Sequence, residues 1–153
     1  MTLEEVLAGF SFFNDNDIEK IKAVGFRDGE VEHFSVLEFF IKKGNLEAVS
    51  LSLENGIDVN SSESGDFGSS LLHIAIRFGQ MEIFQLLLDK EANIDFVDKV
   101  GWTPLMESVV DDKPEFGKIL VEKGANRDFA NHRGATAMAL AQKFGRQSFL
   151  TFL

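Results

Sequence analysis

Short segments that mix apolar and polar residues recur along the chain at a nearly constant spacing. Four such segments of ten residues follow one another at intervals of 35, 33 and 33 residues, at 35–44, 70–79, 103–112 and 136–145. A second amphipathic segment follows each of the first three, at 45–60, 80–95 and 113–128. In these second segments, apolar residues such as Ile83 and Leu87 recur at the spacing of one helical face. Each unit is therefore predicted to contain a short helix, a tight turn, a longer helix and an extended loop.

A period near 33 residues is typical of a stacked repeat array, because one unit cannot bury its apolar face alone. Gly44, Gly79 and Gly145 lie where the first helix must reverse into the second, and glycine adopts the positive φ needed there without steric cost. The third unit has Asp112 at this position, and Asp is among the few other residues that tolerate this conformation. Pro114 then suits the first turn of the next helix. The expected fold is an all-α solenoid of helix-turn-helix units with short hairpin-like loops.

The units resemble the ankyrin repeat, whose pattern is G-x-T-P-L-H-x-A-A-x-x-G, an amphipathic helix and G-A-D-x-N. The third unit matches at both ends, with Gly101, Thr103, Pro104, Leu105, Gly124, Ala125 and Asn126, and the second with Leu72, His73, Ala75 and Gly79. The resemblance covers residues 30–153 as one continuous domain, in units of about 30–64, 65–97, 98–130 and 131–153. The fourth unit is expected to end within its second helix at Leu153.

Residues 1–29 do not fit the repeat, although capping-box spacings predict helices there. We expect this segment to be a helical cap on the array; the alternative is a degenerate repeat.

Composition narrows the functional classes. The chain has 153 residues, the size of one domain, and its net charge of −10 argues against general binding to a nucleic-acid backbone. It has no cysteine, and therefore no disulfide, thiolate nucleophile or cysteine zinc site. No segment approaches the roughly 18 consecutive apolar residues that a membrane span needs. The chain also begins with acidic rather than basic residues, unlike a secretory signal. We expect a cytoplasmic protein outside membranes that is monomeric when free.

A search for catalytic chemistry gives no candidate. The chain has none of the nucleophile, phosphate-binding or dinucleotide-binding motifs, and its three histidines do not pair at metal-ligand spacing. His73 occupies the T-P-L-H position, where the ankyrin resemblance implies a structural side chain that hydrogen-bonds to neighbouring loops. We predict no catalytic, cofactor-binding or metal-binding residue.

Ankyrin-type arrays bind proteins, and the resemblance implies contact through the loop tips and the exposed sides of the first helices, which line a concave surface. By position in the repeat, the partner-binding candidates are Asp66, Phe67, Arg77, Phe78, Lys99, Trp102, Val110, Asp111, His132, Arg133 and Phe144. Aromatic side chains are not required there for stacking and are typical of binding hot spots. The alternative is that each ring packs over a neighbouring repeat.

The leading functional hypothesis is a non-catalytic protein that binds one partner protein through this surface and inhibits or neutralises it. The acidic, cysteine-free chain is similar to bacterial ankyrin-repeat immunity or antitoxin proteins, which would imply a basic toxin or enzyme as partner. Residues 1–68 hold 14 acidic and 5 basic side chains; this charge either steers a basic partner or only solvates the surface. The alternative function is a passive adaptor or assembly scaffold.

Overall fold

A computed structural model describes residues 33–54 and 56–153, and these form seven helices and no strand. The helices are α3 (His33–Lys43), α4 (Leu46–Glu54), α5 (Leu71–Arg77), α6 (Met81–Asp89), α7 (Pro104–Val110), α8 (Pro114–Glu122) and α9 (Ala137–Lys143). The predicted cap at residues 1–29 lies outside the described residues. The all-α expectation is confirmed for the described part of the chain.

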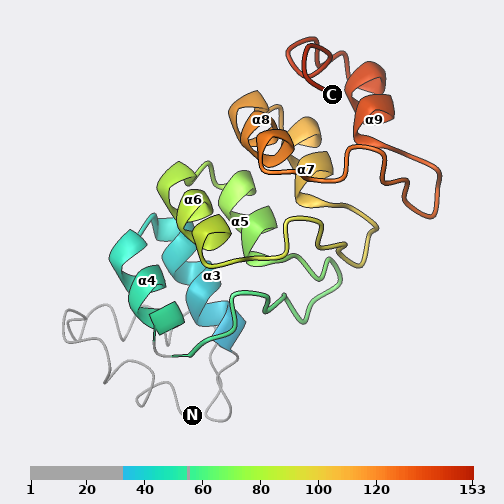
Figure 1. Ribbon diagram of the computed structural model, residues 1–153. Coiled ribbons are helices and arrows are strands. Elements are labelled where there is room, and N and C mark those ends of the chain that lie inside the picture. Colours follow the sequence, from blue (N-terminus) through green and yellow to red (C-terminus); the bar gives the residue numbers. More distant parts are fainter. Residues whose placement is uncertain (1–32, 55) are drawn as a thin grey trace.

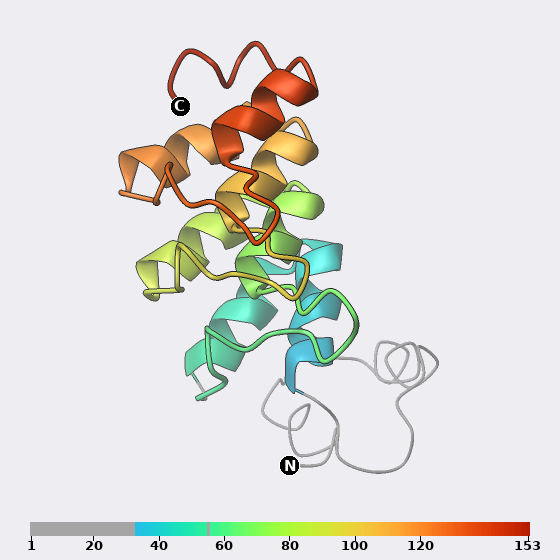
Figure 2. The same ribbon diagram turned by 90° about the vertical axis from the view of Figure 1, so that its right-hand side faces the viewer.

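The helices form pairs that stack along one axis (Figure 1). The first helices of the pairs contact one another in the order α3, α5, α7 and α9. Viewed from the side, α4, α6 and α8 form a second column beside them, and the loops between pairs project on one side of the stack (Figure 2). The predicted solenoid of helix-turn-helix units is confirmed.

Hydroxyl side chains cap the N-termini of α5, α7 and α9, each the first helix of its repeat. Ser70, Thr103 and Thr136 have extended backbones, and their side-chain oxygens accept hydrogen bonds from the amides three residues later. Such an N-cap satisfies one of the amides that the first helical turn leaves without a partner. Because these three residues are 33 positions apart, the same local chemistry starts α5, α7 and α9.

The turns within the pairs have the predicted backbone conformation. The φ angles are 68° at Gly44, 68° at Gly79, 55° at Asp112 and 66° at Gly145. The next amide donates to a carbonyl five residues earlier at each turn, as in Gln80 N to Ala75 O at 2.9 Å. This pairing is the Schellman motif that terminates a helix. A left-handed residue therefore ends the first helix of every described pair.

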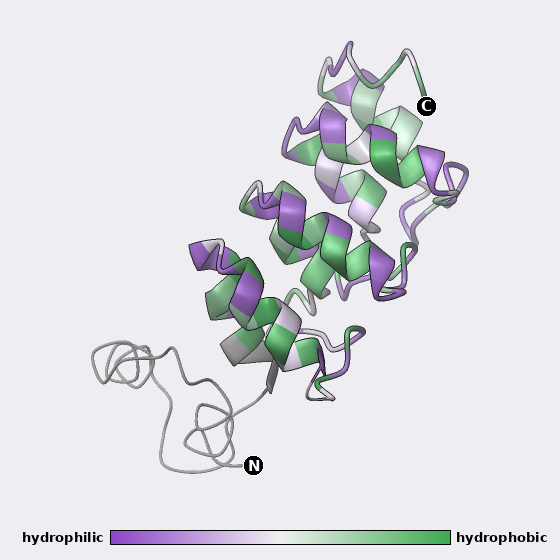
Figure 3. Cartoon of the chain, turned by 60° about the vertical axis from the view of Figure 1, so that its left-hand side comes forward, coloured by the Kyte–Doolittle hydropathy of each residue, from purple (hydrophilic) through white to green (hydrophobic). Residues whose placement is uncertain are grey.

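One continuous apolar core runs through the stack. The rings of Phe84 and Phe116 meet edge to face with centroids 5.0 Å apart, which joins α6 to α8. Hydrophobic and hydrophilic residues are interspersed along the helices, and hydrophilic residues gather at helix ends and in loops (Figure 3). Each helix pair thus completes its core only against its neighbours, as expected for a solenoid.

The expectation of a second helix in the fourth unit is wrong. Residues 147–152 form successive turns, in which the amides of Phe149, Leu150 and Phe152 donate to carbonyls three residues earlier. This spacing closes tighter turns than the α-helical spacing of four. Phe149 is fully buried and lies against Gly117 of α8. The turns therefore cover the end of the core without a helix.

Long basic side chains connect the third pair and α9 to the helix pair before them. Lys113 Nζ donates to the Ile76 and Arg77 carbonyls at 2.6 and 2.7 Å, at the end of α5. Arg146, 33 positions later, donates to the Val109 and Val110 carbonyls at the end of α7. The last carbonyls of a helix lack intrahelical partners and carry negative partial charge. These contacts therefore hold the first helices of consecutive pairs together.

Candidate functional site

The loop tips are shaped by one repeated turn and one longer variant of it. In the loop 98–102, Asp98 Oδ1 accepts from the amides of Val100 and Trp102 at 2.9 and 2.8 Å. Asn131 forms the same pair of bonds 33 positions later. The preceding tip closes between Glu63 and Ser69 and is two residues longer. Phe67 lies in this longer loop and is 58% exposed.

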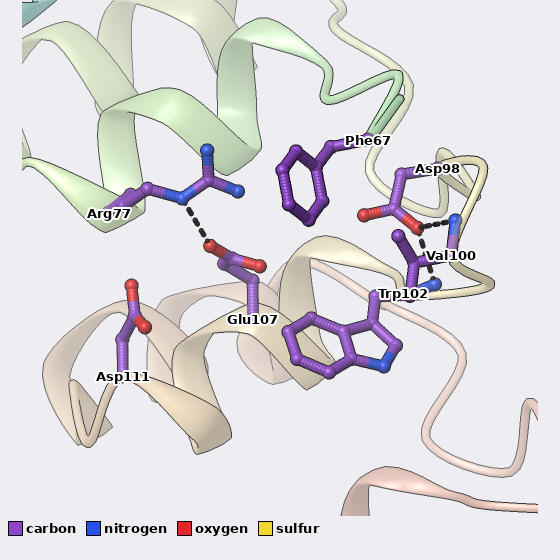
Figure 4. Close-up of a pocket in the computed structure, with 7 residues that line it drawn as sticks. All are labelled: Phe67, Arg77, Asp98, Val100, Trp102, Glu107 and Asp111. Atoms are coloured by element: carbon purple, nitrogen blue, oxygen red, sulfur yellow. Dashed lines mark hydrogen bonds and ion pairs between the residues drawn. The ribbon is translucent and has the colours of Figure 1, made fainter. Parts of the chain in front are cut away.

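A pocket of about 380 Å³ lies between the second and third helix pairs on the side of the loops. Its lining residues are Phe67, Arg77, Asp98, Val100, Trp102, Glu107 and Asp111. Phe67, Val100 and Trp102 come from the two loops, Arg77 from the end of α5, and Glu107 and Asp111 from α7 and its C-terminus. Glu107 lies between Arg77 on one side and the two aromatic rings on the other (Figure 4). The volume is within the range of sites for small ligands or single side chains.

A buried carboxylate forms part of the pocket wall. Glu107 Oε1 accepts from Arg77 Nε at 2.8 Å, and Arg77 Nη2 also donates to Ser69 Oγ at 3.2 Å. The Glu107 side chain is only 2% exposed, and its Oε2 has no hydrogen-bond partner among the described residues. Burial raises the pKa of Glu107, although the Arg77 charge opposes this. Among the described residues, Oε2 is therefore a buried carboxylate oxygen without a hydrogen-bond donor.

A buried histidine positions the Trp102 loop. His73 Nε2 donates to the Trp102 carbonyl at 3.1 Å, while Nδ1 lies 2.7 Å from Ser70 Oγ. Loss of hydration lowers the pKa of His73 to about 4, despite the opposing charge of Asp98. We assign the Nε2–H tautomer because the Ser70 amide donates to Nδ1. The predicted hydrogen bond from His73 to a neighbouring loop is confirmed.

Four of the predicted partner-binding residues meet in this pocket: Phe67, Arg77, Trp102 and Asp111. Trp102 is partly buried and packs against the core as well as lining the pocket. The Trp102 ring therefore packs against the array, and its contact with a partner stays a prediction.

The remaining candidates lie elsewhere on the surface. Phe78 and Phe144 are 43% and 45% exposed at the ends of α5 and α9, each near a lysine ammonium group. Lys99 Nζ donates to the Ser64 and Gly65 carbonyls, so this side chain ties two loops together. Asp66, Val110, His132 and Arg133 are not among the pocket-lining residues.

Glu107 was missed by sequence reasoning. It lies inside a short helix at a position that corresponds, by the 33-residue period, to Ile74 and Leu140. A charge among aligned apolar residues was the available signal. The sequence alone does not show that Glu107 belongs to a site, because this depends on how the two neighbouring loops pack around it.

Neither a group of metal-ligating side chains nor a membrane-spanning helix occurs in the described part of the chain. Its His, Asp and Glu side chains form no group of three that could hold a metal ion. None of its helices combines the length and apolar character needed to cross a membrane.

Comparison with known proteins identifies the repeats. The family described as Ankyrin repeats (3 copies) matches residues 16–98, 37–128 and 72–153. Protein phosphatase 1 regulatory subunit 27 of Mus musculus is 34% identical over 94 residues, which cover 61% of this chain and 60% of that protein. Probable 26S proteasome regulatory subunit p28 of Saccharomyces cerevisiae is 32% identical over 108 residues, covering 69% of this chain and 46% of that protein. The chain spans less than two thirds of either relative.

Proposed function

Because the chain belongs to the ankyrin-repeat family, we propose that it is a non-catalytic module that binds one partner protein through the concave face bearing the pocket. Ankyrin repeats mediate protein–protein interaction. In this proposal the chain acts by occupying its partner's surface and thereby inhibits or neutralises it. The expected monomeric state and cytoplasmic location are part of the same proposal.

The observation that carries the proposal is the pocket between the second and third pairs. Phe67 and Trp102 project from consecutive loops onto it, next to charged side chains. Large aromatic side chains beside charges and a hollow are typical of the few residues that dominate an interface. Phe67 is 58% exposed and therefore contributes little to the core, which favours an external partner for it.

The names of the relatives support a regulatory role. One is named a regulatory subunit of a protein phosphatase, and another a probable regulatory subunit of the 26S proteasome. We infer that this chain too binds an enzyme and regulates it. The narrower hypothesis, an immunity or antitoxin protein that covers a basic toxin, is supported by the net charge of −10.

An adaptor is the second candidate. The name of the yeast relative places that protein among the subunits of a large assembly. A chain that only holds an enzyme in place leaves its activity intact, whereas an inhibitor abolishes it. The activity of the partner in the complex therefore separates the two functions.

The test is affinity capture with the full chain as bait. Wild type and three variants, Phe67→Ala, Trp102→Ala and Lys118→Ala, are compared in native lysate, and the captured protein is then purified. We expect Phe67→Ala and Trp102→Ala to weaken its binding tenfold or more, about 1.4 kcal/mol. Lys118 is exposed on α8 outside the pocket and provides the matched control.

Equal binding by wild type and Phe67→Ala would contradict the proposed binding face. Trp102→Ala is interpreted only alongside Phe67→Ala, because Trp102 also packs against the core. Where a captured enzyme binds Phe67→Ala more weakly than wild type, its activity in the complex is then measured. Inhibition at one-to-one stoichiometry supports a neutralising function, and full activity supports an adaptor function.

A further inference from the structure

We propose that the pocket is a recognition site for an arginine side chain of the partner protein, whose guanidinium donates to Glu107 and lies against Phe67 and Trp102. This inference rests on the proposed function, because it requires that the face bearing the pocket binds a protein. It adds the chemistry of the group that the partner must present.

The first argument is the unused oxygen of Glu107. A buried polar atom without a hydrogen bond costs free energy, and native structures contain few of them. Oε2 of Glu107 is such an atom among the described residues, and its side chain, 2% exposed, lines the pocket. Arg77 bonds only to the other oxygen of this carboxylate. Oε2 is itself buried, so a donor must enter deeply to reach it, but it need not displace Arg77.

The second argument is that stacking does not require a carboxylate there. At the positions related by the 33-residue period, the array places Ile74 in α5 and Leu140 in α9, and both are buried. Trp102 likewise corresponds to the small residues Ser69 and Ala135. Positions that break the local pattern of a fold are expected at functional sites. The third repeat therefore holds both an acid and a large ring where its neighbours hold neither.

The third argument is charge. The lining includes one cation, Arg77, and three carboxylates, Asp98, Glu107 and Asp111. Asp98 is occupied by the loop amides, but Asp111 forms no ion pair with any described residue. A cation is therefore favoured over an anion.

The fourth argument selects arginine over lysine. The guanidinium is planar, stacks on aromatic faces and has five donors, so it can donate to a carboxylate while it contacts a ring. The rings of Phe67 and Trp102 lie on one side of Glu107, and Arg77 and Asp111 lie on the other (Figure 4). An ammonium is a compact point charge and lacks the flat face that stacks on the rings.

The only tryptophan of the chain reports directly on the pocket. Trp102 fluorescence can be titrated with three capped peptides, acetyl-Gly-Arg-Gly-amide and its lysine and citrulline counterparts, at constant ionic strength. Citrulline keeps the shape of arginine without its charge. We expect a saturable change with the arginine peptide and at least tenfold weaker binding of the other two.

Variants of the full chain complete the test. Glu107→Gln keeps an oxygen acceptor for Arg77 and removes the charge, and we expect at least fivefold weaker binding of the arginine peptide. Glu122→Gln, an exposed change on α8 outside the pocket, should bind as wild type. Circular dichroism checks that both variants stay folded. Equal binding of arginine and citrulline peptides, or unchanged binding by Glu107→Gln, would overturn the inference.

The result also separates this inference from the proposed function. A partner protein that depends on Phe67 but binds Glu107→Gln as tightly as wild type leaves the proposed function intact and refutes arginine recognition. If the arginine peptide binds but the partner protein binds Phe67→Ala as tightly as wild type, the proposed binding face is refuted. The specificity of the pocket for arginine is then still supported.

Discussion

Glu107 occupies a position that neighbouring repeats fill with buried apolar side chains, Ile74 and Leu140. Its carboxylate is desolvated and only half satisfied, by the bond from Arg77 to one oxygen. A buried ion pair is often no better for stability than well-packed apolar residues of similar volume. The Glu107 carboxylate is therefore expected to favour binding of an arginine side chain while it lowers the folding stability of the array.

Glu107→Leu should stabilise the array by about 1 kcal/mol, because it removes a desolvated carboxylate and leaves Arg77, 36% exposed, able to reach water. Urea unfolding at pH 7 measures the change. The same variant should lose binding of the arginine peptide. A loss of stability greater than about 1 kcal/mol would show that the Arg77–Glu107 pair holds the repeats together.

His73 makes stability depend on pH. Its pKa is lowered from 6.5 to about 4 in the folded chain, so the unfolded chain binds the proton more tightly. The contribution of His73 to the free energy of unfolding is therefore fully present above pH 6.5. It is lost as the pH falls toward 4, by roughly 3 kcal/mol at 1.36 kcal/mol per pKa unit. The raised pKa of Glu107 acts in the opposite direction, because its protonation favours the folded state.

Urea unfolding of wild type and His73→Gln between pH 7 and pH 4 isolates this effect. The difference in stability between the two should shrink as the pH falls. His132→Gln, a change in an exposed loop, is the control and should keep the acid-side loss. A wild-type-like pH profile in His73→Gln would refute the role of this group.

At the scale of elements, Lys113 and Arg146 each reach back to the helix pair that precedes them. Lys113 Nζ makes two short bonds to carbonyls at the end of α5. Lys113→Met keeps most of the apolar stem and removes the donor, so it should cost about 1 kcal/mol. The rate of amide hydrogen exchange in α5 and α7 should also rise in Lys113→Met. Lys118→Met, on the exposed side of α8, should change neither measurement by more than about 0.5 kcal/mol.

Gly117 allows the end of the array to close. A Cβ at this position would lie 2.6 Å from Phe149 Cε1 and 2.9 Å from Ser108 Oγ. Gly117→Ala gains up to about 1 kcal/mol of helix propensity, but the clash with a buried ring should cost more, leaving a net loss of about 1–2 kcal/mol. Thermal unfolding measures the net effect. Higher stability would show that Phe149 moves aside without loss.

For the whole molecule, the repeat architecture follows from local signals. Turn residues such as Gly79 and Asp112 act on the backbone within a few positions and were therefore predictable from the sequence. The second helix expected after Gly145 does not form, because residues 147–152 close in three-residue turns around the docked Phe149. That outcome depends on tertiary contact with Gly117, which no local pattern contains.

The candidate site was predictable only in part. The positions of Phe67, Arg77, Trp102 and Asp111 follow from their place in the repeat, which indicates surface exposure. Their gathering around one hollow, and the role of Glu107 in it, depend on how two loops pack across α7. Contacts between repeats are set by side chains from different units, and one unit's sequence does not specify them.

The central claim is that the face bearing the pocket, and not the opposite column of helices, binds a partner protein. Hydrogen exchange of the full chain, free and in complex with the captured partner, tests it most directly. We expect slower exchange in 63–69, 98–102 and α7 on binding, with α4, α6 and α8 unchanged. Protection confined to α4, α6 and α8 would contradict the claim.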